Sequence, residues 1–461
     1  MPFDPRAYAA RFAIAGPNSS GAERVLVRIR GSLPFRYDAR MPRKRRLNRP
    51  VAMVGAGMSK FGMFEDRNST DLFVDAYRDM IDSVDKGFEP DRIDAMYVGN
   101  FTNDFFTGQA HWGALLSDAI GLVPKPATRT EGACASSALA FREAVFAIAS
   151  GFYDVVLVGG VEDMSKRDTA DVAEGLASAA VPYERDVGFT FPGVFGAIAT
   201  AYFHEYGAGR EHLMDVTIKS HDNGALNPKA QFQSTIRAMM DRRIERARQR
   251  GGPVPDWADE KAFLGDPAAN PIVAWPMHVF DCCPISDGAC CILLAAQDVS
   301  RSLTDDPLDV IGIGQGSGRG LHAADRLTSF DATRRAAAEA YGMAGIGPGD
   351  VQCAEVHDCF SMAEILHVED LGFFEPGHGY RAIAEGQTRR DGPKPVNTSG
   401  GLKCKGHPVG ATGGAQLVEL WQQLRGQAGP RQISNPDLRI GAAHNLGGTG
   451  GTSAVTILAR G

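Results

Sequence analysis

The sequence lacks the long apolar runs of a membrane protein and the dense cysteines of a small secreted one. No run reaches the ~18 apolar residues that a membrane-spanning helix needs, and no signal-peptide pattern opens the chain. Only eight cysteines occur in 461 residues, which favours reduced thiols over a disulfide framework. We therefore expect a cytoplasmic protein without a membrane partner, long enough for two or three domains.

The sequence also lacks complete motifs for a bound metal or nucleotide. No CxxC or HxxxH pair offers the ligand spacing of a zinc site. Gly55 and Gly57 form a GxG after an apolar run, but the third glycine of a dinucleotide-binding loop is misplaced at Gly62. A Rossmann site is therefore disfavoured.

The first 50 residues are strongly basic in a chain that is acidic overall. They contain twelve Arg and Lys against three Asp and Glu, whereas the whole chain has a net charge of −7. We interpret residues 1–48 as a solvated, disordered extension. Binding to nucleic acid or an acidic membrane, a transit peptide, and a true start at Met41 are the alternatives.

From residue 51 the hydrophobic pattern predicts alternating strands and helices. Apolar runs bounded by glycine indicate buried strands, and apolar residues three and four apart indicate helices. The predicted strands are 51–57, 95–100, 153–160, 287–297, 307–318, 354–360 and 452–460, and the main predicted helices are 69–84, 135–151, 331–342 and 361–371.

The chain carries a weak internal duplication. Both halves start with a strand that enters a glycine turn and end with a strand rich in alanine and valine. This pattern predicts two similar α/β halves packed together. Between about 165 and 275 the alternation is lost, and we interpret this segment as an insertion carried on the first half.

Cys134 is the first candidate for chemistry. In TEGACASSALAF (130–141) it lies where a loop meets a predicted helix N-terminus, among small residues that leave room for a carbonyl group. The helix dipole and free N–H groups there lower the pKa of a thiol and stabilise the thiolate. The alternative is a buried, inert cysteine.

His357 and Cys359 lie two residues apart in EVHDCF (355–360), on one face of a predicted strand. The pair could be half of a metal site, although no second half is visible. It could instead move a proton at a carbon acid, which needs a thiol or an imidazole within reach of the α-carbon.

Two glycine-rich segments supply the other candidates. His407 lies among glycines in GLKCKGHPVGATGG (401–414), where glycine allows a close approach of the imidazole to a ligand. Cys404 in the same segment is interpreted as incidental. In HNLGGTGG (444–451) the glycines offer backbone N–H donors for an oxyanion, and His444 is either structural or part of the site.

Taken together, these segments resemble the thiolase superfamily from about residue 51 to residue 461. GACASS (132–137), VLVGGVEDMS (156–165), SDGACCILLA (286–295) and GHPVGATGG (406–414) fall in the family's order and spacing. HDCF (357–360) followed by HNLGG (444–448) is similar to the sterol-carrier-protein-type thiolases. Other thiolases have Asn-Glu-Ala-Phe and then Cys-x-Gly at these positions, so this chain lacks their second catalytic cysteine.

The resemblance implies a thiolase fold, α/β in class, with two βαβαβαββ halves in α/β/α/β/α layers. It implies reversible Claisen cleavage of 3-ketoacyl-CoA by coenzyme A, a substrate here, without a metal or redox cofactor. His407 would deprotonate the nucleophile Cys134, and Cys359 would replace the missing thiol. The implied catalytic set is Cys134, His357, Cys359 and His407, and the implied substrate-binding set is His444, Gly447 and Gly448.

Rival functions stay open at this point. A decarboxylating ketosynthase shares the fold and uses one cysteine with two histidines, but it would not need Cys359. An aldolase or lipid-binding relative that has lost the thiolase reaction is a further alternative, against which the presence of both cysteines argues. The only sequence feature that supports a nucleic-acid-binding function is the basic extension 1–48.

We expect three parts: the extension 1–48, a first half 49–300 with the insertion 165–275, and a second half 301–461. Members of this fold bury a strand edge against a second copy. We therefore expect a homodimer or homotetramer that pairs through the apolar strand near 95–100. Acyl-CoA and coenzyme A are the expected partners, and no nucleic acid is expected.

Overall fold

The structure is a computed structural model that describes residues 45–461. The predicted extension 1–48 therefore lies outside the described residues, except for its last four. Leu47 packs against the central apolar cluster, and Arg45 forms an ion pair with Glu339. Residues 45–48 thus belong to the folded body. Among the helices of residues 45–461, none combines the length and apolar character needed to cross a bilayer.

Within this part of the chain, nine strands form one mixed sheet in the order β3-β2-β4-β7-β1-β8-β11-β10-β9. The strands are β1 (Val51–Met58), β2 (Ala95–Gly99), β3 (Ala127–Thr130), β4 (Val155–Glu162), β7 (Gly288–Ala296), β8 (Leu308–Ser317), β9 (Cys353–Glu355), β10 (Ile440–Gly447) and β11 (Thr452–Arg460).

The two halves of this sheet repeat one pattern of pairing. β1 is antiparallel to β7, β7 is antiparallel to β4, and β4 is parallel to β2. In the second half β8 is antiparallel to β11, β11 is antiparallel to β10, and β10 is parallel to β9. The halves join where Ala52 and Met53 of β1 pair with Asp309 and Leu308 of β8. The topology therefore carries the duplication that the sequence indicates.

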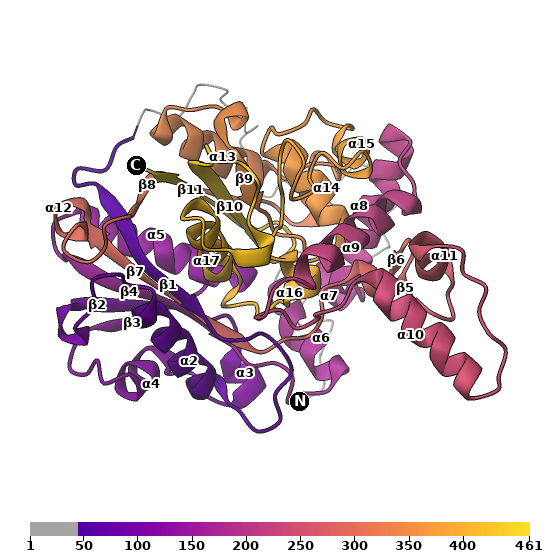
Figure 1. Ribbon diagram of the computed structural model, residues 1–461, viewed down its shortest axis with the longest axis horizontal. Coiled ribbons are helices and arrows are strands. Elements are labelled where there is room, and N and C mark those ends of the chain that lie inside the picture. Colours follow the sequence, from indigo (N-terminus) through magenta and orange to yellow (C-terminus); the bar gives the residue numbers. More distant parts are fainter. Residues whose placement is uncertain (1–44) are drawn as a thin grey trace, which may run out of the picture. The chain divides into compact units, whose positions relative to one another are not determined.

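Helices cover the sheet and fill the space between its halves (Figure 1). α2 (Ser69–Asp82) packs on β1 and β7, and α13 (Asp331–Ala344) has the equivalent place on β8 and β11. α5 (Ser136–Ala149) and α17 (Thr412–Leu424) contact each other and strands of both halves. Their apolar side chains form the central cluster with β1, β4, β7 and β8.

The start of α2 shows how local sequence sets an element. Its N-cap is Asn68, one residue before the first residue of the predicted helix 69–84. The Asn68 side chain accepts hydrogen bonds from the N–H groups of Thr70 and Asp71, and the Asp71 carboxylate accepts from the Asn68 N–H. This capping box satisfies donors that a helix start leaves free.

Two segments near the candidate residues differ from the prediction. The predicted strand 354–360 ends at Glu355, because the next N–H, that of Val356, bonds to the Asn397 side chain instead of a strand. The glycine-rich segment 444–451, for which no strand is predicted, belongs to strand β10 as far as Gly447, so His444 lies inside the sheet. Pairing of β10 with β11 and β9 overrides the weak strand propensity of its small residues.

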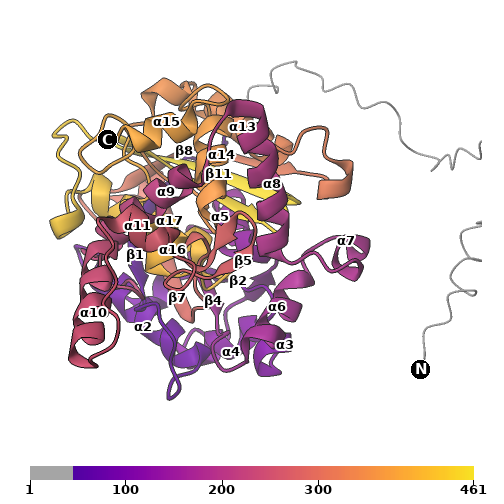
Figure 2. The ribbon, with the colours of Figure 1, turned by 90° about the vertical axis from the view of Figure 1, so that its right-hand side faces the viewer.

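The predicted insertion folds mainly as helices. α8 (Phe191–Tyr206) and α9 (Arg210–Gly224) pack against α14 (Ser361–Asp370) of the second half. In both views α10 lies on the outer side, away from the nine-stranded sheet (Figure 1, Figure 2). The insertion contains α6 (Thr169–Ala177), α7 (Pro182–Asp186), α8 (Phe191–Tyr206), α9 (Arg210–Gly224), α10 (Ile236–Gln249), α11 (Glu260–Gly265) and β5 (Ile272–Ala274), which pairs with β6 (Met277–His278).

The strand expected to pair with a second copy is an interior strand. β2 bonds to β4 on one side and to β3 on the other. The prediction of pairing through 95–100 is therefore wrong, because both edges of β2 are already used. β3 is the edge strand at this end of the sheet.

Candidate active site

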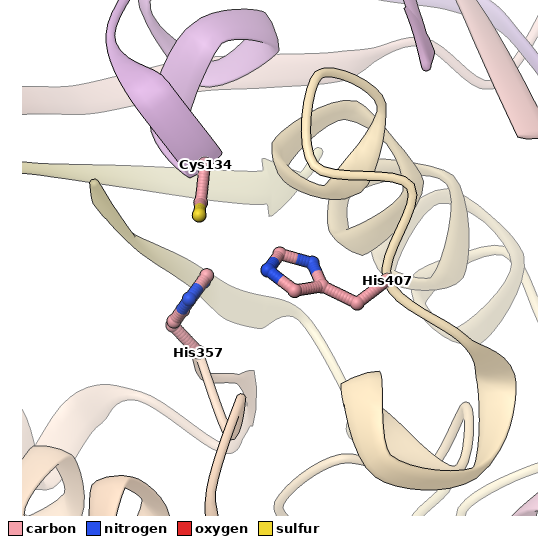
Figure 3. Close-up of side chains that lie close together, drawn as sticks. All are labelled: Cys134, His357 and His407. Atoms are coloured by element: carbon pink, nitrogen blue, oxygen red, sulfur yellow. The ribbon is translucent and has the colours of Figure 1, made fainter. Parts of the chain in front are cut away.

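Three side chains from distant parts of the chain meet near the beginning of α5 (Figure 3). The Sγ atom of Cys134 and one ring nitrogen of each of His357 and His407 lie within 4.8 Å of one another. The two imidazole rings stand edge to face with their centroids 5.1 Å apart. Three of the four predicted catalytic residues thus form one buried cluster.

Cys134 is held in a strained turn that precedes α5. Ala133 has a φ of 51°, a left-handed conformation that alanine rarely adopts. The Ser136 hydroxyl fixes the turn, because it donates to the Ala133 carbonyl at 2.6 Å and accepts from the Gly132 N–H at 3.0 Å. In Figure 3 the sulfur points from this turn toward the two histidines.

The glycines of the 447–448 turn adjoin the same sulfur. Burial raises the pKa of the Cys134 thiol to about 12, and the N–H groups of Gly448 and of Cys134 itself oppose that increase. A Cβ atom on Gly447 would lie 2.2 Å from the Gly132 carbonyl oxygen, so only glycine lets β10 pass so close. The resting thiol is therefore protonated, and it would need a base to act as a nucleophile.

The hydrogen bonds of His407 leave it a free lone pair. Its Nδ1 lies 2.6 Å from the Thr412 Oγ1, and that hydroxyl donates its single proton to the Pro408 carbonyl at 3.0 Å. Thr412 therefore accepts from Nδ1–H, and Nε2 of His407 carries no proton. Burial and then the charge of Lys405 lower the pKa of His407 to about 3. The ring is neutral, with an acceptor facing the thiol.

The hydrogen bonds of His357 have the opposite sense. The Asn445 amide donates to His357 Nδ1 at 2.9 Å, so the ring proton is on Nε2. Burial lowers the pKa of His357, and His407 and His444 add to that shift. His357 therefore presents an N–H donor to the site, whereas His407 presents an acceptor.

His444 lies behind His357 and outside the cluster. Its Nε2 bonds the hydroxyls of Thr333 and Ser453, each at 3.1 Å, and its Nδ1 faces the His357 backbone N–H at 3.5 Å. Both ring nitrogens are used within the protein. This placement favours the structural alternative for His444 over substrate binding.

Cys359 adjoins the cluster together with a thiol that the sequence analysis missed. Burial raises the pKa of Cys359, and the neighbouring thiols of Cys283 and Cys134 raise it further. The Cys283 N–H donates to the Cys359 carbonyl at 2.9 Å. The adjacent residues, Cys282 before Cys283 and Phe360 after Cys359, form an antiparallel bridge. Cys283 and Cys359 thus lie opposite each other. No sequence pattern links DCCP (281–284) to HDCF (357–360).

Cys404 is directed into the insertion. Its thiol donates to the Phe232 carbonyl at 3.0 Å and lies 3.6 Å from His221 Nδ1. A Cβ atom on Gly224 of α9 would lie 2.3 Å from this sulfur. These contacts leave Cys404 occupied away from the cluster.

Both halves of the chain match known protein-family models. Residues 51–298 match the model described as thiolase, N-terminal domain, and residues 315–460 match thiolase C-terminal domain-like. The chain belongs to the thiolase family. It is a thiolase-family acyltransferase with the thiolase fold.

Named relatives agree with this membership. The chain is 42% identical over 416 residues to an acetyl-CoA acetyltransferase of Methanothermobacter thermautotrophicus, covering 89% of this chain and 100% of the relative. It is 29% identical to human sterol carrier protein 2, covering 89% of this chain and 72% of the relative. The resemblance to sterol-carrier-protein-type thiolases is thus confirmed.

A solved structure described as an Ltp2-ChsH2(DUF35) aldolase has the same fold. It is superposable with a TM-score of 0.71 at 24% identity, over 90% of this chain and 98% of that one. At this identity the likeness concerns the fold, which therefore also occurs in a protein with a different named activity.

Buried side chains that the sequence analysis missed hold the loops of this candidate site. The Glu162 carboxylate accepts from the N–H groups of Phe101, Thr102 and Gly410 at 2.9 to 3.0 Å. Burial raises the pKa of Glu162 to about 7, against those hydrogen bonds. Glu162, Thr412 and Asn445 all lie in or beside the recognised motifs, but a motif does not reveal the direction of a hydrogen bond.

An apolar cluster surrounds Cys134. Cys134 packs among side chains from the first half, the insertion and the His407 loop: Phe101, Phe106, Ala133, Met164, Val172 and Val409, with Leu176, Ala179 and Ile285 at its margin. Such surroundings suit an apolar acyl group and exclude water from a thioester.

Proposed function

We propose that this chain catalyses the reversible Claisen cleavage of a 3-ketoacyl-CoA by coenzyme A, with acetyl-CoA as a product and an acyl group carried on Cys134. The opposite hydrogen-bond senses of His407 and His357 carry the proposal. One ring accepts a proton beside the thiol, and the other donates a hydrogen bond to a developing oxyanion. The acetyl-CoA acetyltransferase named among the relatives supports the same reaction.

In the first half-reaction His407 Nε2 takes the Cys134 proton, and the thiolate attacks the 3-keto carbon. The N–H groups of Cys134 and Gly448 hold the tetrahedral oxyanion. When the C2–C3 bond breaks, the enolate oxygen of acetyl-CoA accepts hydrogen bonds from His357 and the protonated His407. Cys359 then protonates the enolate carbon.

In the second half-reaction Cys359, now a thiolate, takes the proton of coenzyme A. The coenzyme A sulfur attacks the Cys134 thioester, and Cys134 leaves and recovers its proton from His407. The cycle restores every group to its resting state. A decarboxylating ketosynthase would need no acid at the position of Cys359.

Mass spectrometry of the protein with acetyl-CoA tests the proposal. One acetyl adduct should form on Cys134 and disappear in Cys134→Ala, and the wild type should cleave acetoacetyl-CoA when coenzyme A is added. An adduct that persists in Cys134→Ala would contradict the assignment. Cleavage of a 3-hydroxyacyl-CoA without an adduct would instead favour an aldolase.

We also propose that the chain forms at least a homodimer, now through β3 rather than β2. The N–H of Met96 bonds to the Pro126 carbonyl and that of Asn100 to the Thr130 carbonyl. In a parallel ladder this register turns the N–H groups of Ala127 and Arg129 away from β2. These donors form an edge at which a second copy can pair.

A further inference from the structure

The cluster of Cys134, His357 and His407 has the composition of a metal site as well as that of a catalytic one. We propose that the substrate-free protein binds one Zn²⁺ ion reversibly through these three side chains, which blocks acyl transfer until the ion is removed. The inference rests on the geometry of the cluster and not on which acyl donor the protein uses.

The ligand atoms suit zinc in kind and in spacing. Thiolate sulfur and imidazole nitrogen are the ligands that zinc prefers. Zinc bonds of ~2.1 Å to nitrogen and ~2.3 Å to sulfur in tetrahedral geometry place ligand atoms about 3.4–3.7 Å apart. Here the three atoms lie within 4.8 Å of one another, so side-chain rotations that shorten any of these distances by at most about 1.4 Å complete the site. Water would provide the fourth ligand.

His407 is prepared for this coordination. Its Nδ1–H donates to Thr412, so Nε2 already presents a lone pair toward Cys134 (Figure 3). A hydrogen bond from the distal ring nitrogen of a histidine is the usual support for a zinc ligand, because it fixes the tautomer and the ring orientation.

His357 can become a ligand by exchanging tautomers. The Oδ1 atom of Asn445 is buried and has no hydrogen-bond partner among residues 45–461. Rotation of the Asn445 amide would let this oxygen accept from Nδ1–H and so free Nε2 of His357 for the ion. Only Cys134 loses a proton, which leaves to solvent as the zinc–sulfur bond forms; nothing is oxidised or reduced.

The rest of the chain offers a matched comparison. Among residues 45–461 this is the only group of three or more His, Cys, Asp or Glu that meets the spacing, and residues 1–44 contain neither His nor Cys. Cys404 and His221 form another buried sulfur–imidazole pair, at 3.6 Å, with no third ligand. Cys404→Ala therefore removes a comparable thiol without touching the proposed site.

Titration of the metal-free full chain with Co²⁺ tests the inference, because a thiolate ligand to Co²⁺ gives a charge-transfer absorption band. We expect one Co²⁺ per chain, a thiolate band, displacement by Zn²⁺, and binding weakened about 100-fold or more in Cys134→Ser and in His407→Gln. The band should be unchanged in Cys404→Ala. Far-ultraviolet circular dichroism of each variant checks that it is folded.

Two outcomes would overturn the inference. One is wild-type protein that binds no Co²⁺ at equimolar concentration; the other is a band that survives Cys134→Ser or disappears in Cys404→Ala. Neither outcome bears on acyl transfer, which the acetyl adduct tests separately. If the site exists, free Zn²⁺ should inhibit thiolysis and a chelator should restore it.

Discussion

Replacing Cys359 by alanine tests which sulfur moves the proton at the substrate α-carbon. A positioned acid or base contributes about 10²–10⁴-fold to such a step, so Cys359→Ala should slow it by about that factor, equivalent to ~3–5 kcal/mol of barrier. The substitution removes one buried sulfur atom, which costs about 1 kcal/mol of folding stability. The loss of activity should therefore far exceed any loss of folded protein.

Cys283 is the competitor that the structure introduces. Its link to Cys359 is a backbone hydrogen bond from Cys283 N–H to the Cys359 carbonyl, so Cys283→Ala keeps Cys359 in place. We expect this variant to change proton transfer by less than about 10-fold, below the range of a lost acid or base. Cys404→Ala should leave this proton transfer unchanged, because the Cys404 thiol donates a hydrogen bond to the Phe232 carbonyl, away from the candidate site.

The assay is exchange of the acetyl-CoA methyl protons with solvent deuterium, followed by NMR. Acylation of Cys134 by acetyl-CoA, measured by mass spectrometry, is the internal control. It should persist in Cys359→Ala but become slower, because Cys134 and His407 still carry the attack and only the proton for the leaving coenzyme A sulfur is lost. Near-normal exchange in Cys359→Ala together with lost exchange in Cys283→Ala would refute the reasoning and assign the proton transfer to Cys283.

Three further perturbations follow from the geometry. Asn445→Leu removes the donor that fixes the His357 tautomer; kcat for thiolysis should fall about 10²-fold with the Cys134 adduct retained, and an unchanged kcat would contradict the donor role of His357. Burial lowers the pKa of His367 below 6.5, so below about pH 6.5 the unfolded chain takes up a proton that the folded chain does not. The free energy of unfolding therefore decreases as the pH is lowered. In chemical denaturation, His367→Leu should reduce this dependence by up to ~1.4 kcal/mol per pH unit. Light scattering should report a multiple of 49.3 kDa, and Ala127→Pro should shift it toward the monomer if β3 is the contact.

Sequence pattern was sufficient for the elements that bury a continuous apolar face. β1, β4, β7 and α5 lie within a few residues of their predicted bounds, since apolar periodicity and bounding glycines reflect burial directly. Sequence pattern was not sufficient where tertiary contacts determine the secondary structure. β10 is a strand because β11 and β9 flank it, although its sequence IGAAHNLG reads as a loop.

The sequence motifs contain the residues that the structure brings together at the candidate site, but they do not reveal how those residues are arranged. Cys134 and His407 occur in recognisable motifs, and the structure brings them together with His357. The partners that orient the two histidines, Thr412 and Asn445, were not predicted, because the direction of a hydrogen bond is set in three dimensions. Cys283 was missed because its place opposite Cys359 depends on a backbone pairing between segments 76 residues apart in number.

The duplicated architecture explains why Cys134 and His407, the proposed nucleophile and its proposed base, meet. Cys134 precedes α5, and His407 precedes α17; these are the two central helices, one from each half, and they contact each other. Each helix begins beside the group of Cys134, His357 and His407. The positive dipole ends of both helices therefore lie near the Cys134 sulfur and favour a thiolate or an oxyanion there. Thr412, the first residue of α17, also receives the His407 Nδ1–H. The second half therefore supplies, through one helix start, both the proposed base and the group that orients it. The first half supplies the proposed nucleophile through the matching start of α5.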